Sequence, residues 1–429
     1  MAISPRYLEF LRSTTQAIQD AQKPVRILRA LSWPVEVARD FFARGARELP
    51  RPVYGASRDA AAAVTRFTEL EARLGGDNEM ERFLRATCDS YRTAARMLAS
   101  VGSEDFYRHS CDLYGRPESA IRDGKTTNLE LARHFDQVIG EYAGTDLMGG
   151  EPAVYDDAAA AAELSRRLQG FFVGHPIRVE IDDTIAANAV AGADVVRLKR
   201  GARFSERDLL QLEYHEGHVH VATTLNGRSQ PMFSFLGSGA PRTTNMQEGL
   251  AIFTEFICQV MNVERLRRLT DRILAIHMSE QGADFLDLYR FFLEHDHTEA
   301  QAFDCARRVV RGGRVEGGAP FTKDVCYLDG LLKVTNFLRV ALTRGYSEYV
   351  QLLFVGKLDL DDIPLIAHLS QSGLVAAPRY VPRWAQDLNF LTAYMSYSAF
   401  LGRIDLQVVR QHYEEIIERA AADWPAGEV

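Results

Sequence analysis

The stretch 205–255 constrains the fold of this chain more than any other part of the sequence. Three of the chain's eleven histidines lie there within six residues: His215, His218 and His220. Glu216 directly follows the first of them, and a second acidic segment, 247–251, comes about thirty residues later. Imidazoles and carboxylates grouped in this way are the protein ligands that zinc prefers. We therefore interpret the stretch as a metal site with a catalytic carboxylate beside it.

The residues before the histidines predict a helix. Ser205 and Asp208 form the hydroxyl-and-carboxylate pattern of a capping box, and Leu209 and Leu212 follow at helical spacing. In the common zinc-peptidase helix, H-E-x-x-H, two histidines four residues apart share one face and the glutamate acts as general base. Here Val219 occupies the place of that second histidine.

Two histidines flank Val219, and either could pair with His215. At about 100° per residue, the ring of His218 lies roughly 60° from that of His215 and the ring of His220 roughly 140° away. An ideal helix therefore favours His218. A one-residue bulge after Glu216 would favour His220 instead, and such bulges occur often at functional sites. The spacing leaves both histidines open.

Three motifs, in order along the chain, resemble the bacterial QEGLA motif proteins, which are related to the microtubule-associated tyrosine carboxypeptidases of animals. They are H-E-G-H-V-H at 215–220, N-G-R-S-Q-P at 226–231 and Q-E-G-L-A at 247–251. The resemblance covers most of the chain, from about Ile27 to about Arg419, and is densest between Ile177 and Gly330.

The resemblance implies a set of roles for the site. His215, His220 and Glu248 would be the ligands of one zinc ion per chain, and Glu216 would be the catalytic carboxylate. Zinc lowers the pKa of a bound water toward about 7, and a neighbouring carboxylate can take its proton. Glu255 lies seven residues after Glu248 and so on the same helical face, which predicts that it orients a ligand histidine.

Composition limits the remaining possibilities. The chain of 429 residues can form one large domain or two to three smaller ones, and its net charge of −8 argues against general nucleic-acid binding. The five cysteines are scattered and form no C-x-x-C pattern, which favours a reducing interior. The sequence has no apolar run of the about eighteen residues that a membrane helix needs, and no signal-peptide pattern. We expect a cytoplasmic protein with no membrane contact.

The spacing of apolar residues changes from a helical to a strand pattern after about residue 170. Residues 1–170 carry helical patterns, including those at about 57–74, 78–101, 127–143 and 156–171, whereas 177–181 and 195–198 carry strand patterns. We predict a mainly helical α+β fold, in which the helical region 1–170 packs on a zinc-metallopeptidase-like catalytic core, 171–429. The two strands would form a short antiparallel pair before the histidine helix. Such a pair is either a structural hairpin or an edge that an extended peptide can join.

Residues 225–246 are rich in Gly, Ser, Pro and Asn, which predicts a long loop bordering the site. Asn226 and Arg228 belong to the second motif and are candidates for substrate binding. Arg228 and Arg242 could each hold a carboxylate, because the guanidinium group matches its geometry. The alternative for both arginines is a solvated position on the loop.

Two further candidates lie downstream. Arg311 belongs to the basic cluster 307–314 and could bind the terminal carboxylate or acidic residues of a peptide; the alternative is a charged helix end. Tyr327 lies in 321–330, a segment that also resembles the family, and could donate a hydrogen bond to the oxyanion of a tetrahedral intermediate. A buried structural tyrosine is the alternative.

The segment 294–297, Glu-His-Asp-His, offers a second group of metal-binding residue types. No partner lies at ligand spacing in the sequence, so we interpret the segment as a solvated polar turn.

The resulting functional hypothesis is a zinc-dependent metallopeptidase in which Glu216 is the general base. The resemblance adds that it would act as a carboxypeptidase on the C-terminus of a peptide or protein, and that an aromatic terminal residue would be removed. Two other functions stay open: a zinc hydrolase of a small amide, and a non-enzymatic regulator on a metallopeptidase scaffold. The sequence does not indicate an oligomeric state.

Overall fold

The computed structural model describes residues 4–55, 58–142, 151–183, 185, 188–401 and 413–414. Contacts divide the chain into two units, Met1–Pro382 and Arg383–Val429. The boundary predicted at residue 170 therefore does not coincide with a division of the structure. The N-terminal helices belong to the same unit as the candidate site, and one link between them is a 2.8 Å hydrogen bond from the Tyr91 hydroxyl to the carbonyl of Gly239.

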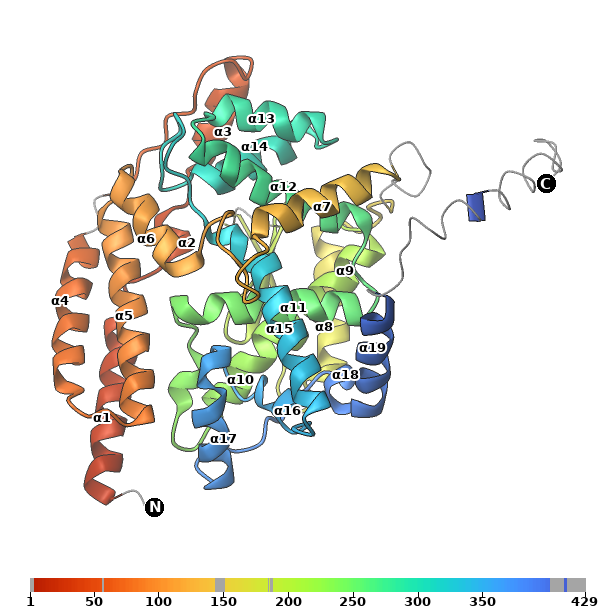
Figure 1. Cartoon of the computed structure of the whole chain (residues 1–429). Coiled ribbons are helices and arrows are strands. Elements are labelled where there is room, and N and C mark those ends of the chain that lie inside the picture. Colours follow the sequence, from red (N-terminus) through yellow and green to blue (C-terminus); the bar gives the residue numbers. More distant parts are fainter. Residues whose placement is uncertain are drawn as a thin grey trace. The chain divides into compact units, whose positions relative to one another are not determined.

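The N-terminal part of the first unit is helical, as predicted. Its helices are α1 (Pro5–Ala21), α2 (Ile27–Ala30), α3 (Val35–Ala43), α4 (Arg58–Arg73), α5 (Glu79–Ala99), α6 (Glu104–Tyr114), α7 (Asn128–Gly140) and α8 (Asp157–Phe171). The four helical patterns agree with α4, α5, α7 and α8, apart from residues 57 and 143, which lie outside the described residues. Helix α6 is not among those patterns; its N-cap is Ser103, whose hydroxyl accepts a hydrogen bond from the Phe106 amide. Figure 1 shows α4 and α5 lying side by side.

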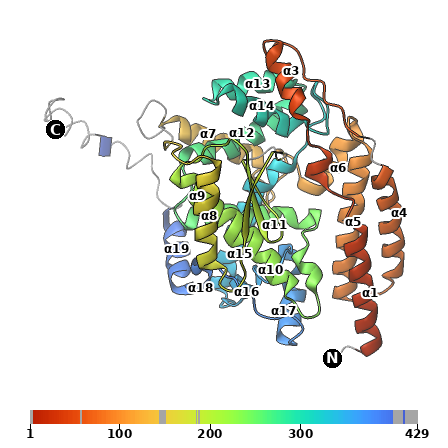
Figure 2. The ribbon, with the colours of Figure 1, turned by 180° about the vertical axis from the view of Figure 1, so that it is seen from behind.

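The sheet corrects the predicted strand pairing. It contains β1 (Arg178–Asp182), β2 (Ala189–Ala191) and β3 (Val195–Lys199), in the order β1-β3-β2 (Figure 2). The two predicted strands, β1 and β3, are neighbours but run parallel, with Val179 opposite Val196. The antiparallel partner of β3 is the three-residue strand β2, which was too short for a periodicity to indicate. Because β2 occupies one edge of β3, β1 pairs at the other.

The rest of the first unit is again mainly helical. Its elements are α9 (Glu206–Leu212), the π-helix η2 (Glu213–Val221), α10 (Ala222–Arg228), η3 (Ser234–Gly237), η4 (Pro241–Thr243), α11 (Thr244–Ile257), α12 (Val263–Glu280), α13 (Phe285–Glu294), α14 (Glu299–Val310), η5 (Lys323–Val325), α15 (Cys326–Thr343), α16 (Tyr349–Leu352), η6 (Leu360–Asp362) and α17 (Ile363–Gln371). The predicted loop 225–246 is therefore wrong in part, since α10, η3 and η4 occupy much of it. The predicted capping box is confirmed, because the Asp208 amide donates to the Ser205 hydroxyl.

The second unit contains α18 (Arg383–Gln386) and α19 (Leu388–Leu401). Within the part of the chain that the structure describes, no helix has the length and apolar character to cross a membrane.

Helices α11 and α15 cross at the centre of the first unit, and two glycines allow their close approach (Figure 1). A Cβ atom on Gly249 would collide with the backbone of Gly330, and one on Gly330 would collide with the carbonyl oxygen of Asn245. Leu250 and Ala251, which follow Gly249, are fully buried. The third motif therefore has a packing role as well as carrying Glu248.

We predict that Gly249→Ala lowers the free energy of unfolding by about 1–3 kcal/mol, the usual cost of overpacking a close contact. Thermal denaturation would measure the loss. Gly170→Ala is the matched control, since Gly170 is also helical but a Cβ added there would meet no other atoms within 4 Å. Equal melting temperatures for the two variants would contradict the packing role of Gly249.

Candidate metal centre

The π-helix η2 decides which histidines come together. Its hydrogen bonds join residues five apart, so residues at i and i+5 share one face. The rings of His215 and His220 consequently lie with their centroids 4.9 Å apart. The widened helix spans nine residues, more than the one-residue bulge considered from the sequence. Gly217 lets it pack closely on α8, because a Cβ there would collide with the side chain of Leu168.

His218 points away from that pair. Its ring stacks on Phe171 at 3.8 Å and meets the ring of Tyr214 edge-on. Neither of its ring nitrogens forms a hydrogen bond with the described residues, and burial lowers its pKa to about 3. The side chain is therefore a neutral packing group in this structure.

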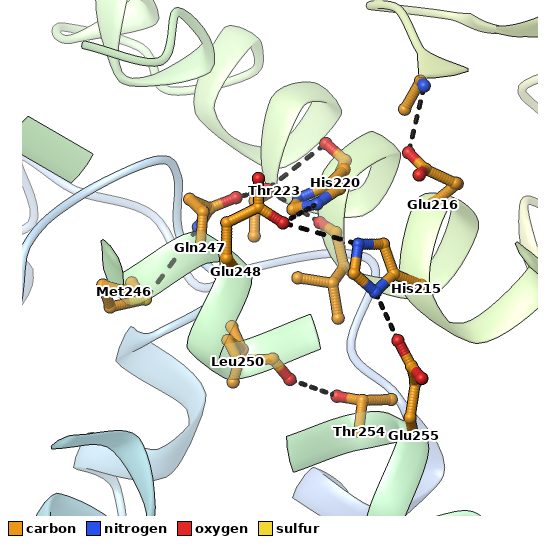
Figure 3. A network of polar contacts seen from close by, with 12 residues as sticks. His215, Glu216, His220, Thr223, Met246, Gln247, Glu248, Leu250, Thr254 and Glu255 are labelled. Atoms are coloured by element: carbon orange, nitrogen blue, oxygen red, sulfur yellow. Dashed lines mark hydrogen bonds and ion pairs between the residues drawn. The ribbon is translucent and has the colours of Figure 1, made fainter. Parts of the chain in front are cut away.

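Glu248 completes a group of three ligand residues (Figure 3). Its Oε2 lies 3.5 Å from His215 Nε2 and 3.6 Å from His220 Nε2, and the ligand atoms of the three residues all lie within 4.8 Å of one another. Zinc bonds to nitrogen and oxygen are about 2.0–2.2 Å long, so one ion could bind all three atoms. Two imidazoles and one carboxylate would leave a fourth position for water.

Glu255 fixes the orientation of His215. Its Oε1 lies 2.6 Å from His215 Nδ1, which leaves Nε2 directed at Glu248 (Figure 3). Arg265 donates to both oxygens of Glu255, at 3.1 and 3.2 Å. Burial raises the pKa of Glu255, but Arg265 and His215 outweigh it and lower the value to about 2. Conversely, burial lowers the pKa of His215, but Glu248 and Glu255 raise it to about 10. The centre of the cluster thus favours positive charge.

Lys323 was not among the predicted site residues. Its Nζ lies 2.8 Å from Glu248 Oε1, so one oxygen of Glu248 binds the lysine while the other faces the histidines. Burial raises the pKa of Glu248, but the lysine and the two histidines outweigh it and hold the value well below its usual range. The segment 321–330 was singled out by resemblance, but nothing in its local pattern indicates that Lys323 faces Glu248.

Glu216 lies on the side of η2 that faces the sheet. The backbone amide of Ala191 in β2 donates to its Oε2 at 3.0 Å, and the side chain is half-buried (Figure 3). The edge strand β2 therefore lies beside the candidate catalytic carboxylate.

A comparison with known families places the chain as a whole. The model of the microtubule-associated tyrosine carboxypeptidase family matches residues 39–403, most of the chain. The chain belongs to this family. A search of curated proteins finds no match. Membership supports a carboxypeptidase-like peptidase activity at the level of the family.

In this member of the tyrosine carboxypeptidase family, Asn226 has a structural position. Its amide nitrogen donates to the carbonyls of Phe354 and Tyr380, both at 2.8 Å, and its oxygen accepts from the amides of Arg379 and Tyr380 at 3.0 and 2.9 Å. The amide group is buried and its donors and acceptor are all used. We therefore correct the prediction that Asn226 binds substrate.

The two arginines of the segment 225–246 differ in whether their guanidinium groups are free to bind a substrate. Arg242 forms a two-point ion pair with Asp362, at 2.7 and 2.8 Å, so it is not free to hold a substrate carboxylate. Arg228 is exposed at the end of α10. Its charge acts on the buried amine of Lys357.

Lys357 is a second residue that the sequence did not indicate. Burial lowers the pKa of its amine to about 8, although the charges of Glu216 and Glu248 oppose the shift. Among the described residues, no hydrogen bond or ion pair of this amine is present. Its backbone amide donates to the carbonyl of Leu236 at 2.7 Å, which fixes the residue against η3.

Tyr327 lies beside Lys323, the lysine that binds Glu248, and the charges of Arg311 and Tyr327 act on each other. The Tyr327 ring is 5.3 Å from Lys323 Nζ and is 8% exposed. Arg311 is also 8% exposed and its guanidinium lies 5.5 Å from the ring of Phe321. Within the described residues this guanidinium has no hydrogen bond or ion pair, and burial lowers its pKa to about 10.

We predict that Asn226→Ala lowers the free energy of unfolding by at least about 1–3 kcal/mol, because it leaves buried backbone groups without partners. Thermal denaturation would measure this. Arg228→Ala, at an exposed position in the same motif, is the control and should melt as wild type does. If Asn226 served only substrate binding, its variant would melt normally and only KM would rise.

Proposed function

We propose that the chain is a zinc-dependent metallocarboxypeptidase. The observation that carries the proposal is the grouping of His215, His220 and Glu248 with Glu216 beside the first ligand. The donor set suits zinc. Glu216 directly follows the first ligand, its charge acts on His215, and its carboxylate accepts a hydrogen bond from the Ala191 amide.

The chemistry divides between the ion and the protein. Zinc, when bound, supplies Lewis acidity and lowers the pKa of its water to about 7. Glu216 takes the proton of the attacking water and later gives it to the leaving amine, as a general base and then a general acid. Glu255 holds His215 in the tautomer that leaves Nε2 for the metal. Lys323 keeps Glu248 charged and in place.

Substrate binding would use β2 and Tyr327. Strand β2 is at the edge of the sheet, so an extended peptide can pair with this edge and run past Glu216, which already binds the Ala191 amide. The Tyr327 hydroxyl, which has no hydrogen bond among the described residues, would donate to the developing oxyanion. The terminal residue removed would be aromatic, in keeping with the tyrosine in the family's description.

A carboxypeptidase also needs a cation for the terminal carboxylate. Arg311 is buried and Lys357 is half-buried, and both lack an acidic partner in the described part of the chain. A buried cation without a partner is costly, so an incoming carboxylate would be favoured at either position. Arg311 is the residue predicted from the sequence, and Lys357 is the one whose amine interacts electrostatically with Glu216. Arg228, exposed nearby, could assist.

We predict about one more zinc ion per chain in wild type, Glu216→Gln and His218→Ala than in His215→Ala and His220→Ala, because only the last two remove proposed ligands. Elemental analysis would measure the metal. Assays on peptides with free C-termini would then detect trimming by wild type and His218→Ala, and none by Glu216→Gln.

Zinc lost from His218→Ala but kept by His220→Ala would contradict the ligand assignment. Zinc binding without cleavage of any peptide would contradict the peptidase and favour the small-amide hydrolase or the non-enzymatic regulator.

We further predict that Arg311→Gln or Lys357→Met raises KM about 10- to 100-fold for a peptide with a free C-terminus, the equivalent of losing a charged hydrogen bond of about 1.5–3 kcal/mol. The same peptide with an amidated C-terminus is the matched control, because it lacks the charge. The variant at the true carboxylate site should cleave both peptides equally poorly. If both variants keep the wild-type preference for the free C-terminus, neither residue binds the carboxylate.

A further inference from the structure

A second group of histidines and carboxylates lies where α7, α12 and the turn after α13 meet (Figure 1). Asp136 comes from α7, Asp271 from α12, and His295 and His297 from the turn. The ligand atoms of Asp136, Asp271 and His295 lie within 4.8 Å of one another. The prediction of a solvated polar turn at 294–297 is therefore wrong, because its partners come from helices far away in the sequence.

The turn directs two imidazoles at one carboxylate. Asp296, between the two histidines, adopts a left-handed conformation with φ of 62°, which few non-glycine residues do. His295 Nδ1 lies 2.8 Å from Asp271 Oδ1, and His297 Nε2 lies 3.6 Å from Asp271 Oδ2. The two histidines and Asp271 thus present three potential ligands in one place.

The two carboxylates have unused binding capacity. The Asp271 side chain is fully buried, and its Oδ2 forms no hydrogen bond within the described residues. Asp136 is half-buried and, among those residues, has neither a hydrogen bond nor an ion pair. A buried acceptor without a hydrogen bond costs about 1–3 kcal/mol, and more when it is charged. A bound cation would remove this cost.

The charge and the donor types indicate which cation fits. The two carboxylates carry a charge that a divalent ion would balance. Arg267, whose charge also acts on His295, pairs with the exposed Asp296 at 3.5 Å. Mixed imidazole and carboxylate ligands suit zinc and similar first-row divalent metals.

We propose that Asp136, Asp271, His295 and His297 form a second, structural site for a divalent metal of the zinc class. The ion would join α7, α12 and the α13–α14 turn. Helix α12 also carries Arg265, which holds Glu255, so the second site would stabilise the helix that supports the first. The inference does not depend on peptidase activity.

The test uses the full chain with both His215 and His220 replaced by alanine, which removes the first proposed site. This protein is loaded with zinc, freed of excess metal and analysed for bound zinc, and its melting temperature is measured with and without zinc. We expect about one zinc per chain, the content of a single site, and a higher melting temperature with zinc. Adding Asp136→Asn or His297→Gln should weaken zinc binding more than about tenfold. Loss of a residue that only hydrogen-bonds to a ligand already lowers metal affinity by about tenfold or more, so loss of a ligand should cost at least as much.

Asp296→Asn, which changes a neighbouring carboxylate of the same turn, is the matched control and should keep the zinc. Asp136→Asn breaks no hydrogen bond of the described structure, so it should fold normally. If the double-alanine protein does not fold, the zinc content of wild type is compared with that of the single variant Asp136→Asn. The proposal then predicts about two zinc ions per chain in wild type and about one in Asp136→Asn. No zinc in the background protein, or equal zinc binding in Asp136→Asn and Asp296→Asn, would overturn the proposal.

Discussion

The geometry of the site depends on one imidazole that lies between two carboxylates of the same helix. His215 faces Glu248 through Nε2 and Glu255 through Nδ1, and the two glutamates are seven residues, or about two turns, apart on α11. His215 and Glu255 are buried and Glu248 is half-buried, so each carboxylate depends on the imidazole and on a cation for its partners. Arg265 and Lys323 complete the arrangement from α12 and η5, one for each glutamate.

This arrangement imposes conditions on the helices around it. Helix α11 must approach α15 closely enough for Lys323, just before α15, to reach Glu248, and Gly249 and Gly330 permit that approach. The π-helix must bring His220 onto the face of His215, and Gly217 lets this wider helix pack on α8. Two of the three glycines lie in the motifs that carry the ligands. These short motifs therefore supply both the proposed metal ligands and the close helix packing.

The sequence predicted those parts of the structure that depend on local patterns. Capping and periodicity located α4, α5, α7, α8 and α9, and the seven-residue spacing put Glu255 on the face of Glu248. Spacing could not choose between His218 and His220, because the choice depends on a helix type that tertiary packing stabilises. It also could not indicate Lys323, Lys357 or Arg265, since a buried cation is recognised only from the carboxylates near it. Strand β2 was missed because three residues carry no periodicity, and its presence changed the pairing of the other two strands. The sequence also misjudged the polar turn at 294–297, because its carboxylate partners lie on helices that the sequence does not place nearby.

The most direct test of the central claim is an anomalous diffraction map, recorded at the zinc edge, from crystals of the zinc-loaded protein. The account predicts a peak about 2.0–2.2 Å from His215 Nε2, His220 Nε2 and a Glu248 oxygen, with none at His218. A peak bound by His218, or no peak among these three residues, would contradict it.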